Sequence, residues 1–197
     1  MPSQSKNSIA CKNLIKIIGG RWRGRNLSVA DEPGLRPTAN RIRETLFNWL
    51  SLDIASAVCL DCFAGSGALG FEAASRGAQQ VVMVEPVASV YRLLQNQIKV
   101  FEADQIDVYQ GEVMQYLQTC QLQFNFVFID PPYAKPELRD EVLKGLIEKD
   151  LLQHGCKLFI EWPKHEQFEL NGEHLTWLKL KNAGQVSYGI AQLLGNG

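Results

Sequence analysis

From residue 57 onward, short apolar runs alternate with helical patterns, and this alternation restricts the chain to few folds. Alternation of this kind is typical of a parallel sheet flanked by helices. Strands are predicted at 57–61, 80–85, 106–109, 124–129 and 157–161, and helices at 67–76, 87–101, 113–120 and 137–152. Two later runs, 175–181 and 186–193, predict an antiparallel hairpin joined by residues 182–185. The sequence therefore predicts an α/β domain of five parallel strands plus a C-terminal antiparallel hairpin, with helices on both faces.

The segment that precedes this domain is basic. Residues 1–50 contain nine Lys or Arg but only three Asp or Glu. The whole chain, in contrast, is nearly balanced, with 20 Lys or Arg and 21 Asp or Glu. Runs at 14–18 and 27–29 predict a small hairpin, and Thr38 is the expected N-cap of a helix reaching about Leu50. Arg41 and Arg43 lie off the apolar stripe of that helix and are expected to face solvent or a ligand. We expect a disordered tail at 1–13, a basic RNA-binding hairpin and helix at 14–52, and a catalytic domain at 53–197.

Several functional classes are disfavoured by the composition. No apolar stretch approaches the roughly 20 residues that cross a bilayer, and the polar start lacks a signal-peptide pattern. Five cysteines without framework spacing predict reduced thiols and a cytoplasmic protein. The Cys59-x-x-Cys62 pair crosses a predicted strand end, which disfavours a redox motif. The three histidines lack metal-ligand spacing, so no metal is expected.

A glycine-rich turn follows the first parallel strand and opens a helix. Its pattern, Gly65-x-Gly67-x-x-Gly70, matches the dinucleotide fingerprint, and Glu85 stands where a ribose-binding acid belongs. Asp61 argues against a dinucleotide, because its carboxylate would confront the pyrophosphate. A ligand with an ammonium and a sulfonium centre would instead be stabilised by that charge. An NAD-linked oxidoreductase remains the alternative at this point.

A second motif, Asp130-Pro131-Pro132-Tyr133, directly follows the apolar fourth strand. Two prolines remove two amide donors, which leaves local carbonyls able to accept hydrogen bonds. Ligands of open parallel sheets bind beyond the carboxyl ends of the strands, so this motif is expected beside the glycine-rich turn. The Asp130 carboxylate and a proline carbonyl can hold both N–H groups of a base amine, while the ring of Tyr133 stacks on the base. The motif predicts methyl transfer to an exocyclic amine.

Residues 61–70 together with 130–133 resemble the Rossmann-like class I methyltransferases, which bind S-adenosylmethionine and hold a target amine. The segments 17–25, 34–38, 41–50, 75–78 and 183–186 extend the resemblance to the RsmD-type 16S ribosomal RNA guanine-N2 methyltransferases. This resemblance implies methylation of the guanine numbered 966 in small-subunit ribosomal RNA. We expect the 16S RNA to be met within an assembled or partly assembled small subunit, and we expect the protein to be a monomer. Cys62 stands where the family usually has Leu, and Glu112 stands where Asp is common.

The resemblance also implies roles for individual residues. The catalytic residues would be Asp130, Pro131, Pro132 and Tyr133. The cofactor would contact Asp61, Phe63, Ala64, Gly65, Ser66 and Gly67 through its methionine portion, Glu85 through its ribose, and Glu112 and Val113 through its adenine, with Arg36 and Thr38 folding over the pocket. The RNA would contact Arg21, Trp22, Arg23, Arg25, Arg41 and Arg43. Two alternatives remain, a DNA adenine-N6 methyltransferase and a non-catalytic RNA-binding protein of ribosome assembly.

Overall fold

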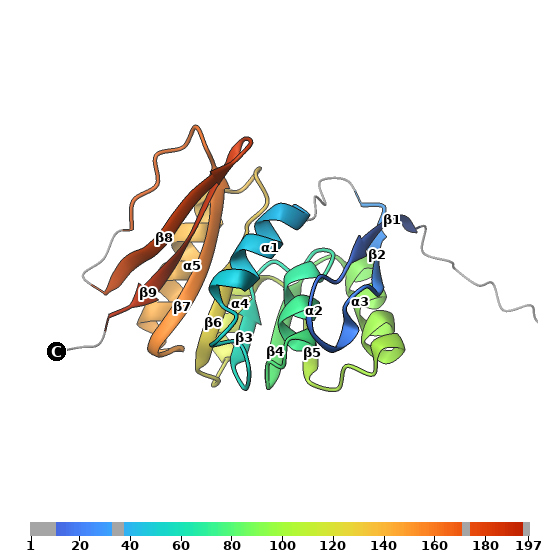
Figure 1. Ribbon diagram of the computed structural model, residues 1–197. Helices are drawn as coiled ribbons and strands as arrows, with labels where there is room; N and C mark the ends of the chain where they lie inside the picture. The colour runs from blue at the N-terminus through green and yellow to red at the C-terminus, as the bar shows by residue number, and fades with distance from the viewer. Residues whose placement is uncertain (1–10, 33–37, 171–173, 195–197) are drawn as a thin grey trace, which may run out of the picture.

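A seven-stranded sheet with helices on both faces forms the body of the molecule (Figure 1). The computed structural model describes residues 11–32, 38–170 and 174–194. The strand order is β5-β4-β3-β6-β7-β9-β8; the first five are parallel, and β9 pairs antiparallel with β7 and β8. The predicted α/β sheet of five parallel strands with a C-terminal hairpin is confirmed.

The parallel strands and their crossover helices lie near the predicted ranges. The strands are β3 (Val58–Asp61), β4 (Gln80–Glu85), β5 (Ile106–Gln110), β6 (Phe124–Ile129) and β7 (Leu152–Pro163). The helices are α2 (Ala68–Ser75), α3 (Ala88–Phe101), α4 (Val113–Thr119) and α5 (Glu137–Glu148). The sequence predicted that the last of these helices ends at residue 152 and that the next strand begins at 157, and both bounds were wrong. In the structure α5 ends at Glu148 and β7 begins at Leu152. Asp150 has a positive φ of 53° that reverses the chain, and Leu152 is buried where it pairs with Phe124.

The C-terminal hairpin has a tighter turn than the sequence suggested. It consists of β8 (Leu175–Ala183) and β9 (Val186–Leu193), so only Gly184 and Gln185 connect the strands. Asn182 and Ala183 continue β8, and both pair with residues of β9. Gly184 has a φ of 60°, which a two-residue hairpin turn requires and glycine tolerates.

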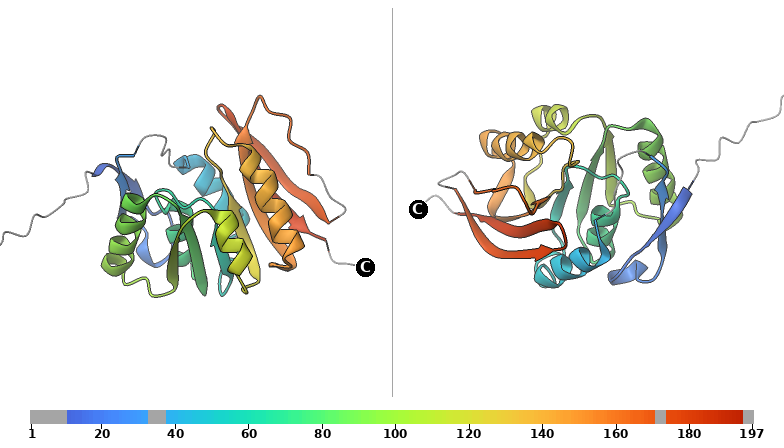
Figure 2. Two further views of the ribbon diagram at one scale, coloured as in Figure 1. Left: turned by 180° about the vertical axis from the view of Figure 1, so that it is seen from behind. Right: turned by 90° about the horizontal axis from the view of Figure 1, so that it is seen from above.

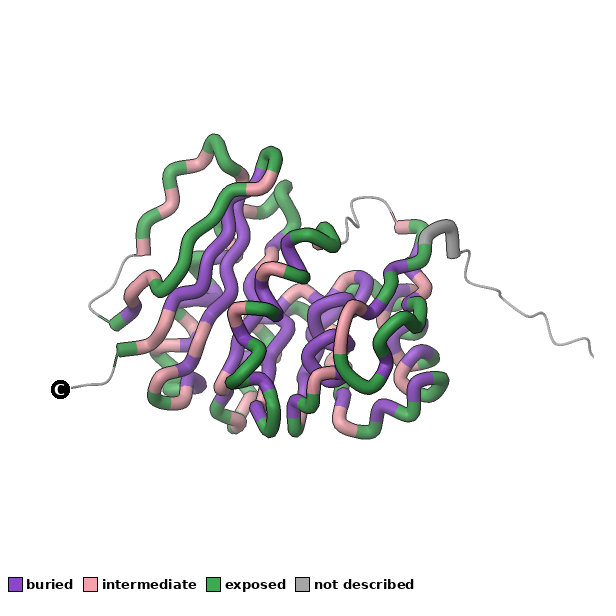
Figure 3. Tube along the Cα trace, in the orientation of Figure 1, coloured by how far each residue is buried: buried purple, intermediate pink, exposed green. Residues whose placement is uncertain are grey.

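Two apolar layers hold the helices against the sheet. One layer contains side chains of α1 (Asn40–Trp49), α2 and α3, and the other contains side chains of α4 and α5. Figure 2 shows how these helices surround the sheet. The strands in the middle of the sheet are buried along most of their length (Figure 3), as their uninterrupted apolar runs predict. Among the described residues, no helix has the length and apolar character needed to cross a membrane.

The basic N-terminal segment packs onto the domain as a small hairpin. It comprises β1 (Cys11–Lys16), a 3-10 turn (Gly20–Trp22) and β2 (Asn26–Ala30). Residues 11–13 belong to β1 and are not part of a tail, while residues 1–10 lie outside the described residues. Ile17 and Leu27 are buried in the same apolar layer as α2 and α3. The division into a unit at 14–52 and a unit at 53–197 stays a prediction.

One buried carboxylate, Glu72 of α2, joins this hairpin to the helices. It accepts hydrogen bonds from the backbone N–H groups of Ile18 and Gly19, both at 2.8 Å. It also pairs with the guanidinium groups of Arg43 in α1, at 3.4 Å, and Arg76, at 2.8 Å. The side chains of Glu72 and Arg43 are both 0% exposed. A buried pair of this kind is costly to break, because the remaining charge loses its partner.

Replacing Glu72 with Gln should therefore destabilise the fold. The variant keeps the side-chain volume and leaves the buried Arg43 guanidinium without its counter-charge. We expect the free energy of unfolding in urea to fall by about 3–5 kcal/mol. The matched control is E148Q on α5, whose exposed side chain pairs with Lys144 at 3.7 Å. That control should change the free energy of unfolding by less than about 0.5 kcal/mol. Equal stability of E72Q and the wild type would contradict the role of Glu72.

Candidate active site at the carboxyl edge of the sheet

A pocket of about 780 Å³ opens beyond the carboxyl ends of the parallel strands. This is the edge at which open α/β sheets bind ligands. Most residues predicted to bind a cofactor or a target amine line this one pocket: Thr38, Asp61, Phe63, Ala64, Gly65, Ser66, Glu85, Glu112, Val113, Asp130, Pro131, Pro132 and Tyr133. Arg36 lies outside the described residues. The structure thus brings together two motifs that stand about 60 residues apart in the sequence.

The glycine-rich turn forms the floor of the pocket and requires glycine for two reasons. Gly67 has a φ of 75°, and a Cβ atom there would lie 2.7 Å from the Leu94 side chain. A Cβ atom at Gly70 would lie 2.5 Å from the sulfur of Met83, so α2 can approach β4 closely. Gly67 is the N-cap of α2 and is not among the residues that line the pocket. Its part in the site is to shape the turn.

Glu85 connects the end of β4 to this turn. One of its carboxylate oxygens accepts the N–H of Gly65 at 2.9 Å, and the other accepts the N–H of Val87 at 2.8 Å. Burial raises the pKa of Glu85 above its ordinary value, although these two hydrogen bonds act in the opposite direction. Each carboxylate oxygen has a second lone pair, so Glu85 can also accept hydrogen bonds from two neighbouring hydroxyl groups. Glu112 and Val113 line the same pocket at the start of α4.

Asp61, at the end of β3, is only 2% exposed and accepts the N–H of Gly70 at 3.2 Å. Burial, with a smaller contribution from the Asp130 carboxylate, raises the pKa of Asp61 from its ordinary 3.8 to about 7. A cationic ligand beside Asp61 would favour the ionised form and lower that pKa again. The pocket is therefore suited to a ligand that carries positive charge.

Asp130 begins the loop after β6 and is held by a residue from the N-terminal segment. The hydroxyl of Thr38 donates to its carboxylate at 2.9 Å. The prediction that Thr38 caps α1 was wrong, because Ala39 occupies the N-cap position and makes no side-chain hydrogen bond there. Pro132 accepts the backbone N–H of Lys135 at 2.8 Å, which closes the turn after the two prolines. Tyr133 is 45% exposed, so its ring can meet a ligand.

The residues predicted to contact RNA differ widely in exposure. Arg23 and Arg41 are exposed, and Arg41 also lines the pocket. Arg21 and Arg25 are exposed as well, but both donate to the last turn of α3, to the carbonyls of Glu102 and Val100. Positive charge at a helix C-terminus is stabilising, so these two arginines have a structural role.

Two of the predicted RNA contacts, Trp22 and Arg43, were wrong. The Trp22 ring is buried and packs 6.1 Å from the ring of Phe71 and 5.4 Å from that of Phe101, measured between ring centroids. Arg43 is fully buried in its ion pair with Glu72 and also donates to the carbonyl of Lys16. The hairpin covers the face of α1 that the helical pattern alone assigned to solvent.

Sequence reasoning missed two acidic residues, Glu72 and Glu161. Glu161 lies near the end of β7, is 5% exposed and lines the pocket. Its position was signalled, because it ends the fifth predicted strand as Asp61 and Glu85 end the first two. Nothing in the sequence marked Glu72, which lies in a helix that is buried on all sides.

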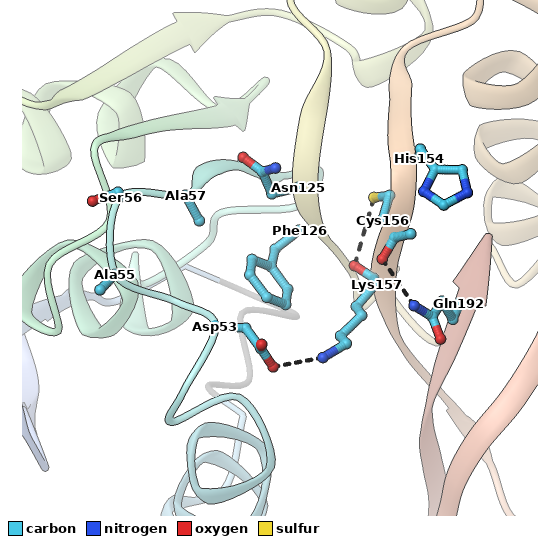
Figure 4. Close-up of a pocket in the computed structure, with 11 residues that line it drawn as sticks. Asp53, Ala55, Ser56, Ala57, Asn125, Phe126, His154, Cys156, Lys157 and Gln192 are labelled. Atoms are coloured by element: carbon cyan, nitrogen blue, oxygen red, sulfur yellow. Dashed lines mark hydrogen bonds and ion pairs between the residues drawn. The ribbon is translucent and has the colours of Figure 1, made fainter. Parts of the chain in front are cut away.

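A second pocket, of about 300 Å³, lies at the opposite edge of the sheet (Figure 4). Lys157 and Asp53 line it and form an ion pair with each other, and Asn125 and His154 also line it. None of the predicted site residues belongs to it. Within the described ranges, no three His, Cys, Asp or Glu side chains are grouped in a way that could hold a metal ion.

Comparison with known proteins agrees with this geometry. The family model described as "Conserved hypothetical protein 95" matches residues 15–192. The protein named "Ribosomal RNA small subunit methyltransferase D" from Escherichia coli K12 is 40% identical over 90% of this chain and 89% of its own length. The protein of the same name from Haemophilus influenzae is 38% identical over 92% of this chain and 95% of its own length. The solved structure of the E. coli protein yhhF is similar with a TM-score of 0.86 and 36% identity, covering 92% of this chain and 99% of that one.

The raised pKa of Asp61 predicts a pH dependence of stability. Between the unfolded value of 3.8 and the folded value of about 7, the folded state binds more protons at this site. Asp61 therefore contributes a loss of stability as the pH rises through that window, by up to about 1.4 kcal/mol per pH unit. We expect the free energy of unfolding of D61N, minus that of the wild type, to increase from pH 5 to 7 and then level off. A difference that does not change with pH would contradict the assigned pKa.

Proposed function

The chain belongs to the Conserved hypothetical protein 95 family of RsmD-type methyltransferases, and from that premise we propose its substrates and site residues. It transfers a methyl group from S-adenosylmethionine to the exocyclic N2 of the guanine at position 966 in 16S ribosomal RNA. The observation that carries the proposal is one pocket lined by Asp61, Glu85 and Asp130. The buried carboxylates of Asp61 and Glu85 suit a cationic donor, and the loop after β6 can hold an amine beside it.

In this proposal the cofactor lies along the ends of β3 and β4. Asp61 and the turn at 63–67 hold its methionine portion, and the two oxygens of Glu85 accept hydrogen bonds from the ribose hydroxyls. Glu112 and Val113 contact the adenine at the start of α4. Thr38 and Arg36 cover the pocket from the N-terminal side. The charge of Asp61 opposes a pyrophosphate, which favours this ligand over a dinucleotide.

Catalysis would depend on the Asp130 loop. S-adenosylmethionine supplies a methyl group made electrophilic by its sulfonium centre. Asp130 and the carbonyl of Pro131 accept the two N–H groups of guanine N2 and turn its lone pair toward that methyl group; the carbonyl of Pro132 already accepts the N–H of Lys135. N2 forms the new N–C bond as the C–S bond breaks with its electron pair left on sulfur, and the surplus proton on N2 passes to Asp130. Positioning and electrostatic support of the charged amine would provide most of the rate enhancement.

The RNA would approach from the side of the N-terminal segment. Exposed Arg23 and Arg41 are assigned to phosphates, and Arg41 lies at the pocket itself. Arg21 and Arg25 donate hydrogen bonds to carbonyls at the end of α3, and their exposed surfaces would contact the same RNA. We expect a monomer that acts in the cytoplasm on an assembled or partly assembled small subunit, without a metal ion.

Replacing Asp130 with Ala should abolish methyl transfer. The variant loses the carboxylate that orients N2, so we expect the rate of tritiated methyl transfer to unmodified small subunits to fall at least about 100-fold. Binding of S-adenosylmethionine, measured by calorimetry, should change by less than about threefold, because Asp61 and Glu85 remain. The exposed Asp104, in the loop before β5, gives the control D104N, which should keep full activity. Normal turnover by D130A would contradict the proposal. So would the finding that wild-type protein forms N6-methyladenine in the substrate, as seen when the methylated substrate is digested to nucleosides.

Removing two exposed arginines should reduce the salt dependence of RNA binding. Each arginine that contacts a phosphate contributes about 0.7–0.9 to the slope of log affinity against log salt concentration. The double variant R23A/R41A should therefore show a slope smaller by about 1–2 than that of the wild type, at unchanged thermal stability. The control K144A removes a 74% exposed lysine on α5 and should leave the slope unaltered. An unchanged slope in the arginine variant would place both residues outside the interface.

A further inference from the structure

Glu161 places a buried carboxylate beside the amine-binding loop. Strands β6 and β7 are parallel neighbours, and Ile129 pairs in register with Ile160. The next residue on each strand is therefore acidic, Asp130 on one and Glu161 on the other, and neighbouring strands are about 4.8 Å apart. Both side chains line the same pocket. Glu161 is only 5% exposed. Burying a carboxylate costs free energy unless hydrogen bonds or opposite charges stabilise it.

Tyr133 links this carboxylate to the stacking surface. Its hydroxyl donates to Glu161 at 3.2 Å, although the tyrosine itself is 45% exposed. The hydrogen bond fixes the far end of the ring next to the carboxylate. The aromatic ring of Tyr133 and the carboxylate of Glu161 therefore lie next to each other. This arrangement suits a nucleic-acid base that stacks on the ring and donates hydrogen bonds from its edge to the carboxylate.

The donors and acceptors on the edge of each base determine which base can bind to Tyr133 and Glu161 together. The Watson–Crick edge of guanine presents N1–H beside the N2 amino group, so it offers three N–H donors in a row. Adenine presents a lone pair at N1 beside its amino group. Two carboxylates and one carbonyl match the three donors of guanine, because an ionised carboxylate only accepts hydrogen bonds. A carboxylate facing N1 would repel adenine at that position.

We infer that Glu161 determines base specificity by accepting a hydrogen bond from guanine N1–H while Asp130 holds N2. This inference rests on the proposed function, since it names the atom of the same substrate that Glu161 contacts. It also explains how an Asp-Pro-Pro-Tyr loop, which recognises any base amine, can be restricted to guanine. Glu161 thereby acts on the choice of substrate, and Asp130 acts on the reacting nitrogen.

The test uses 2-aminopurine in place of the target guanine in the substrate RNA. This base keeps the amino group at position 2 but has a lone pair at N1. Wild-type protein should methylate it with a kcat/KM at least about tenfold below that for guanine, as expected for loss of one charged hydrogen bond and gain of a repulsion. The glutamine of E161Q can donate its amide N–H to that lone pair. The ratio of kcat/KM for guanine to kcat/KM for 2-aminopurine should therefore fall by about tenfold or more in this variant.

The control Y133F removes the hydroxyl that contacts Glu161 and keeps the ring. It should lower kcat/KM by a similar factor for both bases and leave their ratio as in the wild type. If Glu161 merely supported Tyr133, E161Q would behave like Y133F, and this result would overturn the inference. Equal wild-type kcat/KM for the two bases would overturn it too, without any variant. A wild-type protein that methylates no guanine N2 at all would instead refute the proposed function.

Discussion

Four carboxylates lie at or near the carboxyl ends of four adjacent strands of the sheet, and their mutual repulsion determines which ligands the pocket can hold. In sheet order they are Glu85 on β4, Asp61 on β3, Asp130 after β6 and Glu161 on β7. Desolvation raises the pKa of Glu85 and Asp61, and neighbouring carboxylates raise both further. A ligand with a cationic centre, together with a base edge rich in N–H donors, relieves this unfavourable concentration of negative charge. A sulfonium donor and a guanine provide those two properties, whereas a dinucleotide would add two phosphate charges.

The N-terminal segment is part of this site and not merely attached to it. Glu72 fixes the hairpin and α1 to α2, the helix that the glycine-rich turn opens. From the same segment, Thr38 reaches the carboxylate of Asp130. The segment that contains the hairpin and α1 is therefore held to the domain at two places, at Glu72 of α2 and at Asp130 after β6.

The sequence predicted the sheet, the crossover helices and both pocket motifs, because each depends on a local pattern. Apolar runs followed by Asp61 and Asp130 sufficed to place two acidic residues at one edge. The burial of Trp22 and Arg43 could not be predicted from a local sequence pattern, because it depends on how the hairpin packs against α1 and α2. The central role of Glu72 could not be predicted either. Its local partner Arg76 is an ordinary helical pair, whereas the contacts that join the hairpin and α1 to it come from Ile18, Gly19 and Arg43, far away in the chain. Glu161 had a local signature, as the acidic end of a strand.

A crystal structure with S-adenosylhomocysteine and an RNA hairpin that carries the target guanine would decide the matter. We expect the amino-acid portion of the cofactor against Asp61, its ribose on Glu85, and guanine N2 within about 3 Å of the Asp130 carboxylate. Cofactor bound at the opposite edge of the sheet, or Asp130 turned away from a base that has entered the pocket, would contradict this arrangement.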